Sequence, residues 1–216
     1  MNEHESCDGV SVGSGGPLAC VSALVGCGFG LLTMAQIPFT KIVSPFDEAE
    51  IRPHKNSMGA AAYVSLSASK KASSIILPPS LSSSPVLVIG SDTVVVHDSK
   101  ILEKPTSNEE AFAMLTSLSS QTHSVYTGVS LHLLNIPSPI TKTFHSTTSV
   151  KFSPLTPSDI SSYIQTGEPM DKAGSYGIQG IGGQFVESIN GCYFNVMGLP
   201  INRVCKLISE MAKEIE

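Results

Sequence analysis

The sequence has few basic residues and no cluster of them. Lysine and arginine together number 13 among 216 residues, against 18 aspartates and glutamates, and the formal net charge is −5. The lack of a basic patch argues against binding to nucleic acids, which requires such a surface. A chain of this charge that binds anionic phosphates needs local positive charge or a metal ion.

Paired cysteines and clustered histidines are also absent. The five cysteines are an odd number and form no CxxC pair, which favours free thiols in a reducing compartment and hence a cytoplasmic protein. No two of the six histidines have the spacing of zinc ligands, and this argues against a metal site built from histidines.

One long run without charge, Pro17–Ala35, is open to three interpretations. A signal peptide would need a basic segment before the run, but Glu3, Glu5 and Asp8 precede it. A membrane span needs about 20 strongly apolar residues, and the glycines within this run weaken that interpretation. We therefore predict a buried strand, a glycine turn and a helix, and no association with a membrane.

The clearest chemistry lies in PVLVIGSDTVVVHDSKILEKP, residues 85–105. Val86–Ile89 is an apolar, β-branched run that predicts a buried strand. We expect this strand to end at Gly90, which puts Asp92 at a strand end, where ligands of open α/β sheets bind. On spacing alone, an aspartate at such a position is more commonly a turn former than a catalytic group.

Periodicity and helix caps predict the remaining elements. Either Thr106 or Ser107 is a good N-cap for a helix that follows, and Thr156 or Ser158 is one for a later helix. Alternating apolar and polar residues predict two strands that pair with each other. The predicted ranges are helices at Met58–Ile76 and Ile201–Ile215, and strands at Phe39–Val43, His123–Leu134, Lys142–Phe152 and Phe185–Glu187.

The glycine-rich segment Thr166–Gly183 is a second candidate for a site. It carries Glu168, Asp171, Lys172 and Gln179 among its glycines. Long, conformationally permissive loops with mixed charges often line binding sites, although a plain surface loop can have the same composition. The number of polar groups in this loop favours a site.

A motif that suggests a different function precedes residues 85–105 and Thr166–Gly183. Gly26–Gly30 has a GxGxG pattern after an apolar run, and Asp47 and Glu48 lie about 20 residues further on, near the spacing of a dinucleotide-binding fingerprint. The match to GxGxxG is incomplete. We keep dinucleotide binding as an alternative, which stabilisation by NAD or NADP would support.

Three segments resemble the Maf (septum-formation) family of nucleoside triphosphate pyrophosphatases: GSDTVVVHDSKILEKP, HSVYTGVSL and TGEPMDKAGSYGIQGIGGQFVESINGCYFNVMGLP. The resemblance is specific from about Val86 to the C-terminus and weaker from Phe39 to Ala72. It looks closest to eukaryotic members, including the N-terminal domain of acetylserotonin methyltransferase-like proteins.

The resemblance implies an α/β fold. A bent, mixed sheet would be flanked by helices, with two lobes around a cleft, similar to inosine-triphosphate pyrophosphatases. We expect residues 1–16 to form a disordered tail. Residues 17–216 would form a single Maf-like domain, with a divergent N-terminal segment at 17–36.

The resemblance also implies catalytic and metal-binding roles. Asp92 matches the residue assigned as proton acceptor in the family, and Glu48 matches an acidic residue after the second strand. Such a carboxylate can orient or deprotonate a water, or hold a divalent metal cation, Mg or Mn, together with phosphate oxygens. We expect Glu48 and Asp92 to be the metal ligands.

Substrate-binding roles follow in the same way. Thr93 and Gln179 match two positions that mark the branch acting on dTTP and UTP. Lys104 matches the lysine of the family's KP motif, and Lys71 matches the lysine of a helix that ends in KA. We expect both lysines to stabilise the β- and γ-phosphates; without the resemblance, each would be taken for a solvated surface charge.

The chain departs from the family at its N-terminal SxSPRR motif. Counting back from Leu31 puts Cys27 and Gly28 in the places of the two arginines, and the only arginines are Arg52 and Arg203, neither of which is expected to substitute locally. Cys and Gly cannot form the bidentate hydrogen bonds of an arginine clamp. The loss of such a contact costs on the order of a few kcal/mol in the transition state.

The sequence thus predicts an enzyme that hydrolyses dTTP- and UTP-type nucleotides to the monophosphate and pyrophosphate with the help of a divalent metal. Three explanations of the missing arginines stay open: a weak enzyme, a nucleotide-binding regulator with little activity, and an N-terminus from an alternative exon or a mistaken gene model. A homodimer is expected from the resemblance alone.

Overall fold

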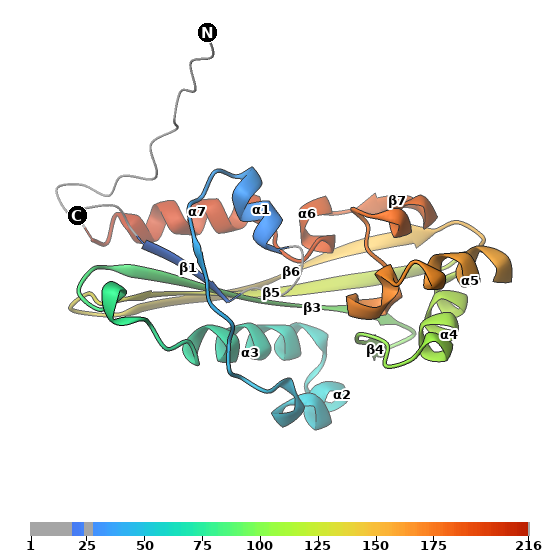
Figure 1. The fold of residues 1–216 in the computed structure, drawn as a ribbon, viewed down its shortest axis with the longest axis horizontal. Helices are drawn as coiled ribbons and strands as arrows, with labels where there is room; N and C mark the ends of the chain where they lie inside the picture. Colours follow the sequence, from blue (N-terminus) through green and yellow to red (C-terminus); the bar gives the residue numbers. More distant parts are fainter. Residues whose placement is uncertain (1–18, 24–27, 216) are drawn as a thin grey trace, which may run out of the picture.

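A computed structural model describes residues 19–23 and 28–215. It contains a mixed seven-stranded sheet in the order β2-β1-β3-β5-β6-β7, with β4 paired to β3, and helices lie on both faces of the sheet (Figure 1). This architecture confirms the predicted α/β fold with a mixed sheet. The predicted tail, residues 1–16, and Cys27 of the N-terminal motif lie outside the described residues.

The strands are few and three of them are long. They are β1 (Ala19–Ala23), β2 (Thr40–Lys41), β3 (Val86–His97), β4 (Lys100–Leu102), β5 (Thr122–Leu134), β6 (Ile140–Phe152) and β7 (Val186–Asn190). β5 and β6 pair with each other in antiparallel register, as predicted.

The helices include several short 3-10 segments in loops. The α-helices are α1 (Gly28–Met34), α2 (Lys55–Met58), α3 (Ala60–Ser73), α4 (Asn108–Leu118), α5 (Pro157–Gln165), α6 (Tyr193–Val196) and α7 (Ile201–Ala212). The 3-10 helices are η1 (Glu48–Glu50), η2 (Arg52–His54), η3 (Pro79–Leu81), η4 (Glu168–Asp171), η5 (Ala173–Ser175) and η6 (Ile181–Phe185).

Strand β3 is longer than predicted. The expectation that it ends at Gly90 is wrong, because β5 pairs with β3 along almost its whole length and carries it on to His97. Asp92 therefore lies in the middle of a strand, opposite Gly128 of β5. The apolar runs before and after Gly90 belong to one strand and not to two.

The other edge of β3 has a gap in its pairing. β1 runs parallel to β3 only as far as Gly90, and β4 pairs with β3 from Val95 onward. Among the described strands, none covers this edge at residues 91–94. Since successive side chains of a strand point to opposite faces, groups from both faces of β3 can reach a ligand here. Asp92 is therefore accessible to a ligand because it lies at this open edge, and not because the strand ends there.

Two large apolar cores lie toward opposite ends of the long strands. In Figure 1, α7 and α1 lie on one face of the sheet near one end, α3 lies on the other face, and α4 and α5 lie near the far end. One core includes Leu87, Ile89 and Ile208, and the other includes Val95, Leu115 and Ile160. The open edge of β3 lies between these two cores, in keeping with the predicted arrangement of two lobes.

The predicted helix caps are present. Ser107 is the N-cap of α4 and accepts a hydrogen bond from the Glu110 N–H. Thr156 caps α5 and forms a capping box with Asp159. The helix predicted over Met58–Ile76 is shorter, because Gly59, at φ 76°, separates α2 from α3.

The uncharged N-terminal run forms a buried strand and a helix, as predicted. Val21 of β1 and Leu31 and Leu32 of α1 are at most 1% exposed. The predicted glycine turn lies outside the described residues. Within the described part of the chain, no helix combines the length and apolar character that a membrane span requires.

Helix α3 packs unusually close to the sheet at Gly128. A Cβ atom at this position would lie 2.3 Å from the backbone carbonyl group of Val64, which belongs to α3. The same helix carries Lys71 near its C-terminal end. The missing side chain at Gly128 therefore sets how close Lys71 comes to the sheet.

We predict that Gly128→Ala destabilises the protein by about 3 kcal/mol, because the added methyl group meets backbone that cannot rotate away. Chemical denaturation measures the effect. Gly30→Ala in α1 is the control: among the described residues, none beyond its chain neighbours and the backbone of its own helix has an atom within 4 Å of the added Cβ, and alanine is favoured over glycine in a helix. Equal stability of the Gly128 variant and the wild type would contradict the prediction.

Candidate active site

Lys71 lies between two carboxylates. Its Nζ is 2.6 Å from Oε1 of Glu48 and 2.7 Å from Oδ1 of Asp92. The Lys71 side chain is only 4% exposed, and that of Asp92 is 12% exposed. One buried ammonium therefore balances two acids, and these three residues are among those that the sequence predicts for the site.

Three elements that are distant in the sequence bring these groups together. Asp47 caps η1, which carries Glu48, by accepting a hydrogen bond from the Ala49 N–H. Lys71 comes from the last turn of α3, and Asp92 comes from the open edge of β3. The close packing of α3 on the sheet makes this contact possible.

Burial and charge shift the pKa values of all three groups. Burial raises the pKa of the Asp92 carboxyl; the Lys71 ammonium opposes this, and the Glu48 carboxylate reinforces it. Burial alone would lower the pKa of Lys71, but the two carboxylates raise it. Burial would raise the pKa of Glu48, but Lys71 and more distant cations lower it. Lys71 is thus held as a cation, and Asp92 has a stronger affinity for a proton than an ordinary aspartate.

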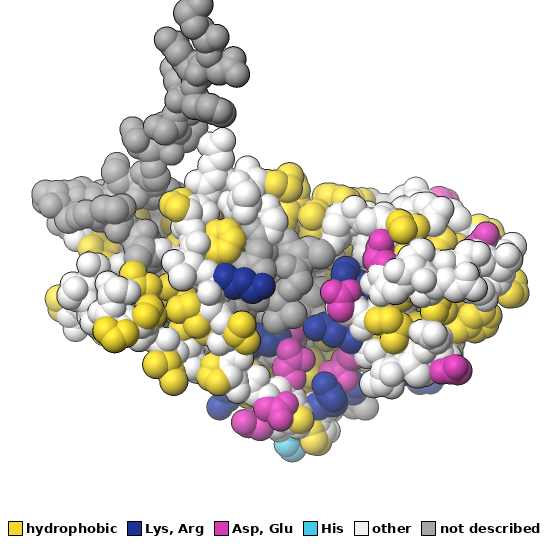
Figure 2. Space-filling view, viewed as in Figure 1, with side chains coloured by type: hydrophobic (Ala, Val, Ile, Leu, Met, Phe, Trp, Pro, Cys, Tyr) yellow, Lys and Arg dark blue, Asp and Glu magenta, His cyan; other side chains and the backbone are white. Residues whose placement is uncertain are grey.

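Two adjoining cavities, of about 100 and 380 Å³, meet at the open edge of β3. We call them the Gln179 cavity and the Glu103 cavity after a residue that lines each. Figure 2 shows acidic and basic side chains gathered near the middle of this face of the molecule. Four residues line both cavities: Asp92, Thr93, Lys104 and Ala173.

The Gln179 cavity combines basic groups with an apolar wall. Lys71, Lys104 and Lys172 supply its basic groups. Its apolar wall is formed by Val95, Val125, Tyr176, Val196 and Met197. Such a mixture suits a ligand with one flat, weakly polar end and one anionic end.

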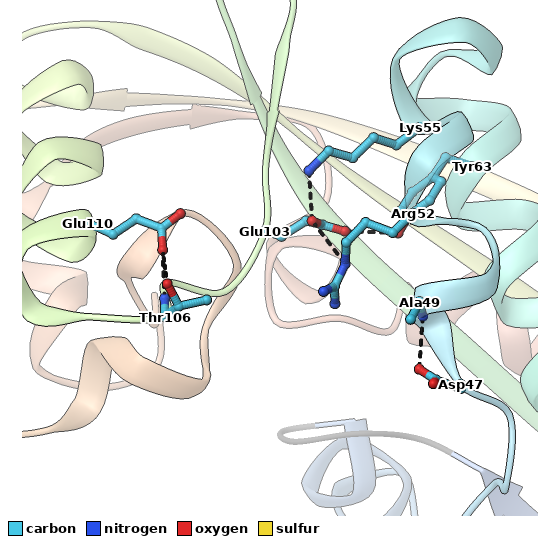
Figure 3. Close-up of polar contacts among 8 residues, drawn as sticks. All are labelled: Asp47, Ala49, Arg52, Lys55, Tyr63, Glu103, Thr106 and Glu110. Atoms are coloured by element: carbon cyan, nitrogen blue, oxygen red, sulfur yellow. Dashed lines mark hydrogen bonds and ion pairs between the residues drawn. The ribbon is translucent and has the colours of Figure 1, made fainter.

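The Glu103 cavity is lined by an ion-pair network that the sequence did not indicate. Glu103 accepts hydrogen bonds from Lys55 Nζ at 2.7 Å and from the Tyr63 hydroxyl at 2.8 Å, and Arg52 Nε lies 3.5 Å from its carboxylate (Figure 3). Arg52 and Lys55 both line this cavity together with Glu48. Arg52, which the sequence analysis did not place at the site, thus lines a cavity beside Glu48.

The glycine-rich loop is organised by Glu168. Its carboxylate accepts hydrogen bonds from the Tyr163 hydroxyl and from the N–H groups of Ile181 and Gly182. These donors outweigh the effect of burial and lower the pKa of Glu168. A Cβ at Gly180 would lie 2.5 Å from this carboxylate, so a larger residue there would displace the Glu168 side chain.

This loop brings polar groups to the Gln179 cavity. Asp171, Lys172 and Gln179 all line it, and Lys172 forms an ion pair with Asp171. This placement supports the prediction that the segment contributes to a site. Glu168 does not line the Gln179 cavity and instead holds the loop through its hydrogen bonds.

A buried pair of rings supports the apolar wall. Tyr176 is 5% exposed, and its hydroxyl lies 2.8 Å from Nε2 of His123. Burial lowers the pKa of His123 to about 4, so this histidine is neutral at neutral pH. His123 is thus a buried core residue.

The residues predicted for the site lie together in the two adjoining cavities. Asp92, Thr93, Gln179, Lys71 and Lys104 all line the Gln179 cavity, and Glu48 lines the adjoining one. Arg52, Lys55 and Glu103 were missed. The signal for Arg52 and Lys55 was the mixture of charges close to Glu48 in the sequence, which is also typical of a solvated surface, and the signal for Glu103 was its place directly before Lys104.

The site is compatible with a divalent metal and does not favour a dinucleotide. Glu48 and Asp92 meet at one point, and each uses a single oxygen for Lys71, so the donor set of two carboxylates suits Mg²⁺ together with phosphate oxygens. The dinucleotide alternative needs an acid that is available to a ribose. Of its two candidates, Glu48 forms an ion pair with Lys71 and Asp47 accepts a hydrogen bond from the Ala49 N–H as the cap of η1.

Comparison with known proteins finds a family and several relatives. The family described as Maf-like protein matches residues 30–211. A dTTP/UTP pyrophosphatase of Clostridium perfringens (strain SM101 / Type A) is 56% identical over 124 residues, which are 57% of this chain and 64% of the relative. The match thus spans less than two thirds of that relative's length.

Other relatives match over a longer stretch. A dTTP/UTP pyrophosphatase of Clostridium botulinum (strain Kyoto / Type A2) is 47% identical over 173 residues, 80% of this chain and 86% of the relative. A dTTP/UTP pyrophosphatase of Clostridium tetani (strain Massachusetts / E88) is 44% identical over the same length and the same shares.

We predict that Lys71→Met raises the pKa of Asp92 further, because the opposing ammonium is lost while burial and Glu48 remain. NMR titration of the carboxyl carbons measures it. Lys70→Met removes an exposed lysine from the same helical turn and serves as the control, with no change expected. An Asp92 pKa that is the same in wild type and Lys71→Met would show that Lys71 does not control this carboxyl.

Proposed function

The chain belongs to the Maf family, and from this premise we propose that it hydrolyses nucleoside triphosphates of the dTTP and UTP type to the monophosphate and pyrophosphate. One observation carries the proposal: a buried lysine orients a carboxylate of raised pKa at an open strand edge, where two cavities with basic groups meet. The names of the relatives support the same reaction.

Asp92 would act as the proton acceptor. Lys71 binds its Oδ1, which fixes the carboxylate and leaves Oδ2 to accept a hydrogen bond from a water. The oxygen of this water would attack the α-phosphorus while the bond from that phosphorus to the bridging oxygen breaks, so that pyrophosphate leaves and Asp92 takes the proton of the water. The raised pKa of Asp92 makes its carboxylate a stronger base than that of an ordinary aspartate.

The phosphates need positive charge around them, and several groups are available. Lys104 lines both cavities, Lys172 lines the Gln179 cavity, and Arg52 and Lys55 line the Glu103 cavity. Arg52 can form the planar, bidentate contacts for which the missing N-terminal arginines are used. This argues for an active enzyme and against a regulator that only binds nucleotides.

A divalent cation, Mg or Mn, would be bound by Glu48 and Asp92. It would supply charge neutralisation on the triphosphate. Lys71 contacts both carboxylates and would hold them in place for such an ion.

The base would lie in the Gln179 cavity. Its apolar wall suits the faces of a pyrimidine, and the Gln179 amide offers a donor and an acceptor to the edge of the ring. A cytoplasmic location and a homodimer are further proposals; the homodimer rests on the family resemblance alone.

We predict that Asp92→Asn reduces pyrophosphate release at least about a hundredfold, because the amide cannot take a proton. The assay compares dTTP, UTP, CTP and dGTP with magnesium, and the wild type should prefer dTTP and UTP. The fold should persist, since the amide oxygen can still accept from Lys71. Asp98→Asn, at the exposed turn after β3, is the control. Wild-type turnover in Asp92→Asn would exclude the proposed role of Asp92.

We predict that Glu48→Gln weakens manganese binding by about tenfold or more, since a neutral amide is a poorer ligand for a hard cation. Electron paramagnetic resonance of free Mn²⁺ measures the affinity without any turnover. Glu50→Gln changes an exposed acid in the same 3-10 helix and should bind manganese as the wild type does. If both variants bind it equally well, Glu48 is not a metal ligand.

A further inference from the structure

We propose that Thr127 is a positioning residue that fixes the Thr93 hydroxyl as a hydrogen-bond acceptor toward the Gln179 cavity. Thr93 would thereby accept from the N3–H group of uracil and thymine and select these bases over cytosine, whose N3 atom carries no hydrogen. The inference rests on the proposed function, because it concerns the base of the nucleotide that this cavity would bind.

The direction of the first hydrogen bond is fixed by chemistry. Thr127 Oγ1 lies 2.8 Å from the backbone carbonyl oxygen of Asn195. A carbonyl oxygen can only accept, so the single hydroxyl hydrogen of Thr127 is donated to it. The Gly198 N–H donates to the same oxygen at 3.0 Å.

The direction of the second bond follows from the first. Thr93 Oγ1 lies 2.8 Å from Thr127 Oγ1. Since the hydrogen of Thr127 is already donated to Asn195, Thr127 can only accept in this contact. Thr93 must therefore be the donor, and its one hydroxyl hydrogen points into the protein. Only the lone pairs of Thr93 are left for a ligand.

Burial protects this arrangement. The side chains of Thr127 and Asn195 are 0% exposed, so water does not compete for the Thr127 hydroxyl. Thr93 lies directly opposite Thr127 in the pairing of β3 with β5, and it lines both cavities. The chain of hydroxyl groups thus begins in the core and ends at the ligand.

An acceptor at this point distinguishes the pyrimidines. The N3 atom of uracil and thymine carries a hydrogen and can donate to Thr93, whereas N3 of cytosine is itself an acceptor. Two acceptors that face each other in a partly buried site lose a hydrogen bond that water would have provided. Gln179 lines the same cavity and can bind a neighbouring carbonyl of the ring.

The test compares Thr127→Val with Thr127→Ser. Valine keeps the shape but cannot accept from Thr93, so the Thr93 hydroxyl becomes free to turn and donate to cytosine. The ratio of UTP to CTP, in kcat/KM and in affinity by calorimetry, should fall about tenfold in Thr127→Val. It should keep its wild-type value in Thr127→Ser, since serine retains the hydroxyl.

The variant is expected to fold, because the Asn195 carbonyl keeps the hydrogen bond from Gly198. Thr93→Val provides a second route: it removes the acceptor itself and should lower the same ratio. A wild-type ratio in Thr127→Val, or an equal fall in the serine variant, would overturn the inference and leave the proposed function intact. A UTP preference in binding that follows the prediction, without pyrophosphate release from any triphosphate, would overturn the proposed function and support the inference.

Discussion

The contact of one buried ammonium with two carboxylates is the constraint on which the rest of the site depends. Removal of charges from water is costly, and Lys71 offsets this cost for Glu48 and Asp92 at once. The contact joins a 3-10 helix, the end of α3 and the middle of β3, and it requires α3 to lie close to the sheet. Gly128 and Gly90 allow that closeness, because a Cβ atom at either position would lie within 2.4 Å of the backbone of α3.

Around this centre, the two cavities differ in their lining. The Glu103 cavity receives basic groups from η2, α2 and the segment after β4, and the Gln179 cavity combines three lysines with Gln179 and an apolar wall. Glu103 and Glu168 can shape the site without contacting a ligand. Each is a hub of hydrogen bonds that holds chain segments in place, and the hydroxyl chain from Thr127 extends the same principle to the base.

The sequence predicted the elements with strong local signals. The caps at Ser107 and Thr156, the paired strands β5 and β6 and the N-terminal strand and helix are local or strictly periodic features. The end of β3 was misplaced, because Gly90 resembles a strand terminator in the sequence and only the partner strand β5 shows that the pairing continues. This error gave the wrong structural setting for Asp92, which lies at an open strand edge and not at a strand end.

The site residues were predicted from the resemblance to the Maf family more than from the spacing of residues in the sequence. Asp92, Lys71 and Glu48 are separated in the sequence, and nothing in their spacing indicates that one lysine serves both acids. Arg52 was not predicted for the site, because nothing in the sequence indicates that η2 lies beside the segment after β4. Thr127 had no signal, since a threonine in an alternating strand is typical of any sheet.

The most direct test of the account is the position of oxygen from water after hydrolysis of UTP in H₂¹⁸O. Asp92 at the open edge of β3 is proposed to deliver water to the α-phosphorus. The account predicts that the label is found in UMP and that the pyrophosphate is unlabelled. Label in the pyrophosphate, or release of UDP and labelled inorganic phosphate, would contradict it, because water would then have attacked the β- or the γ-phosphorus.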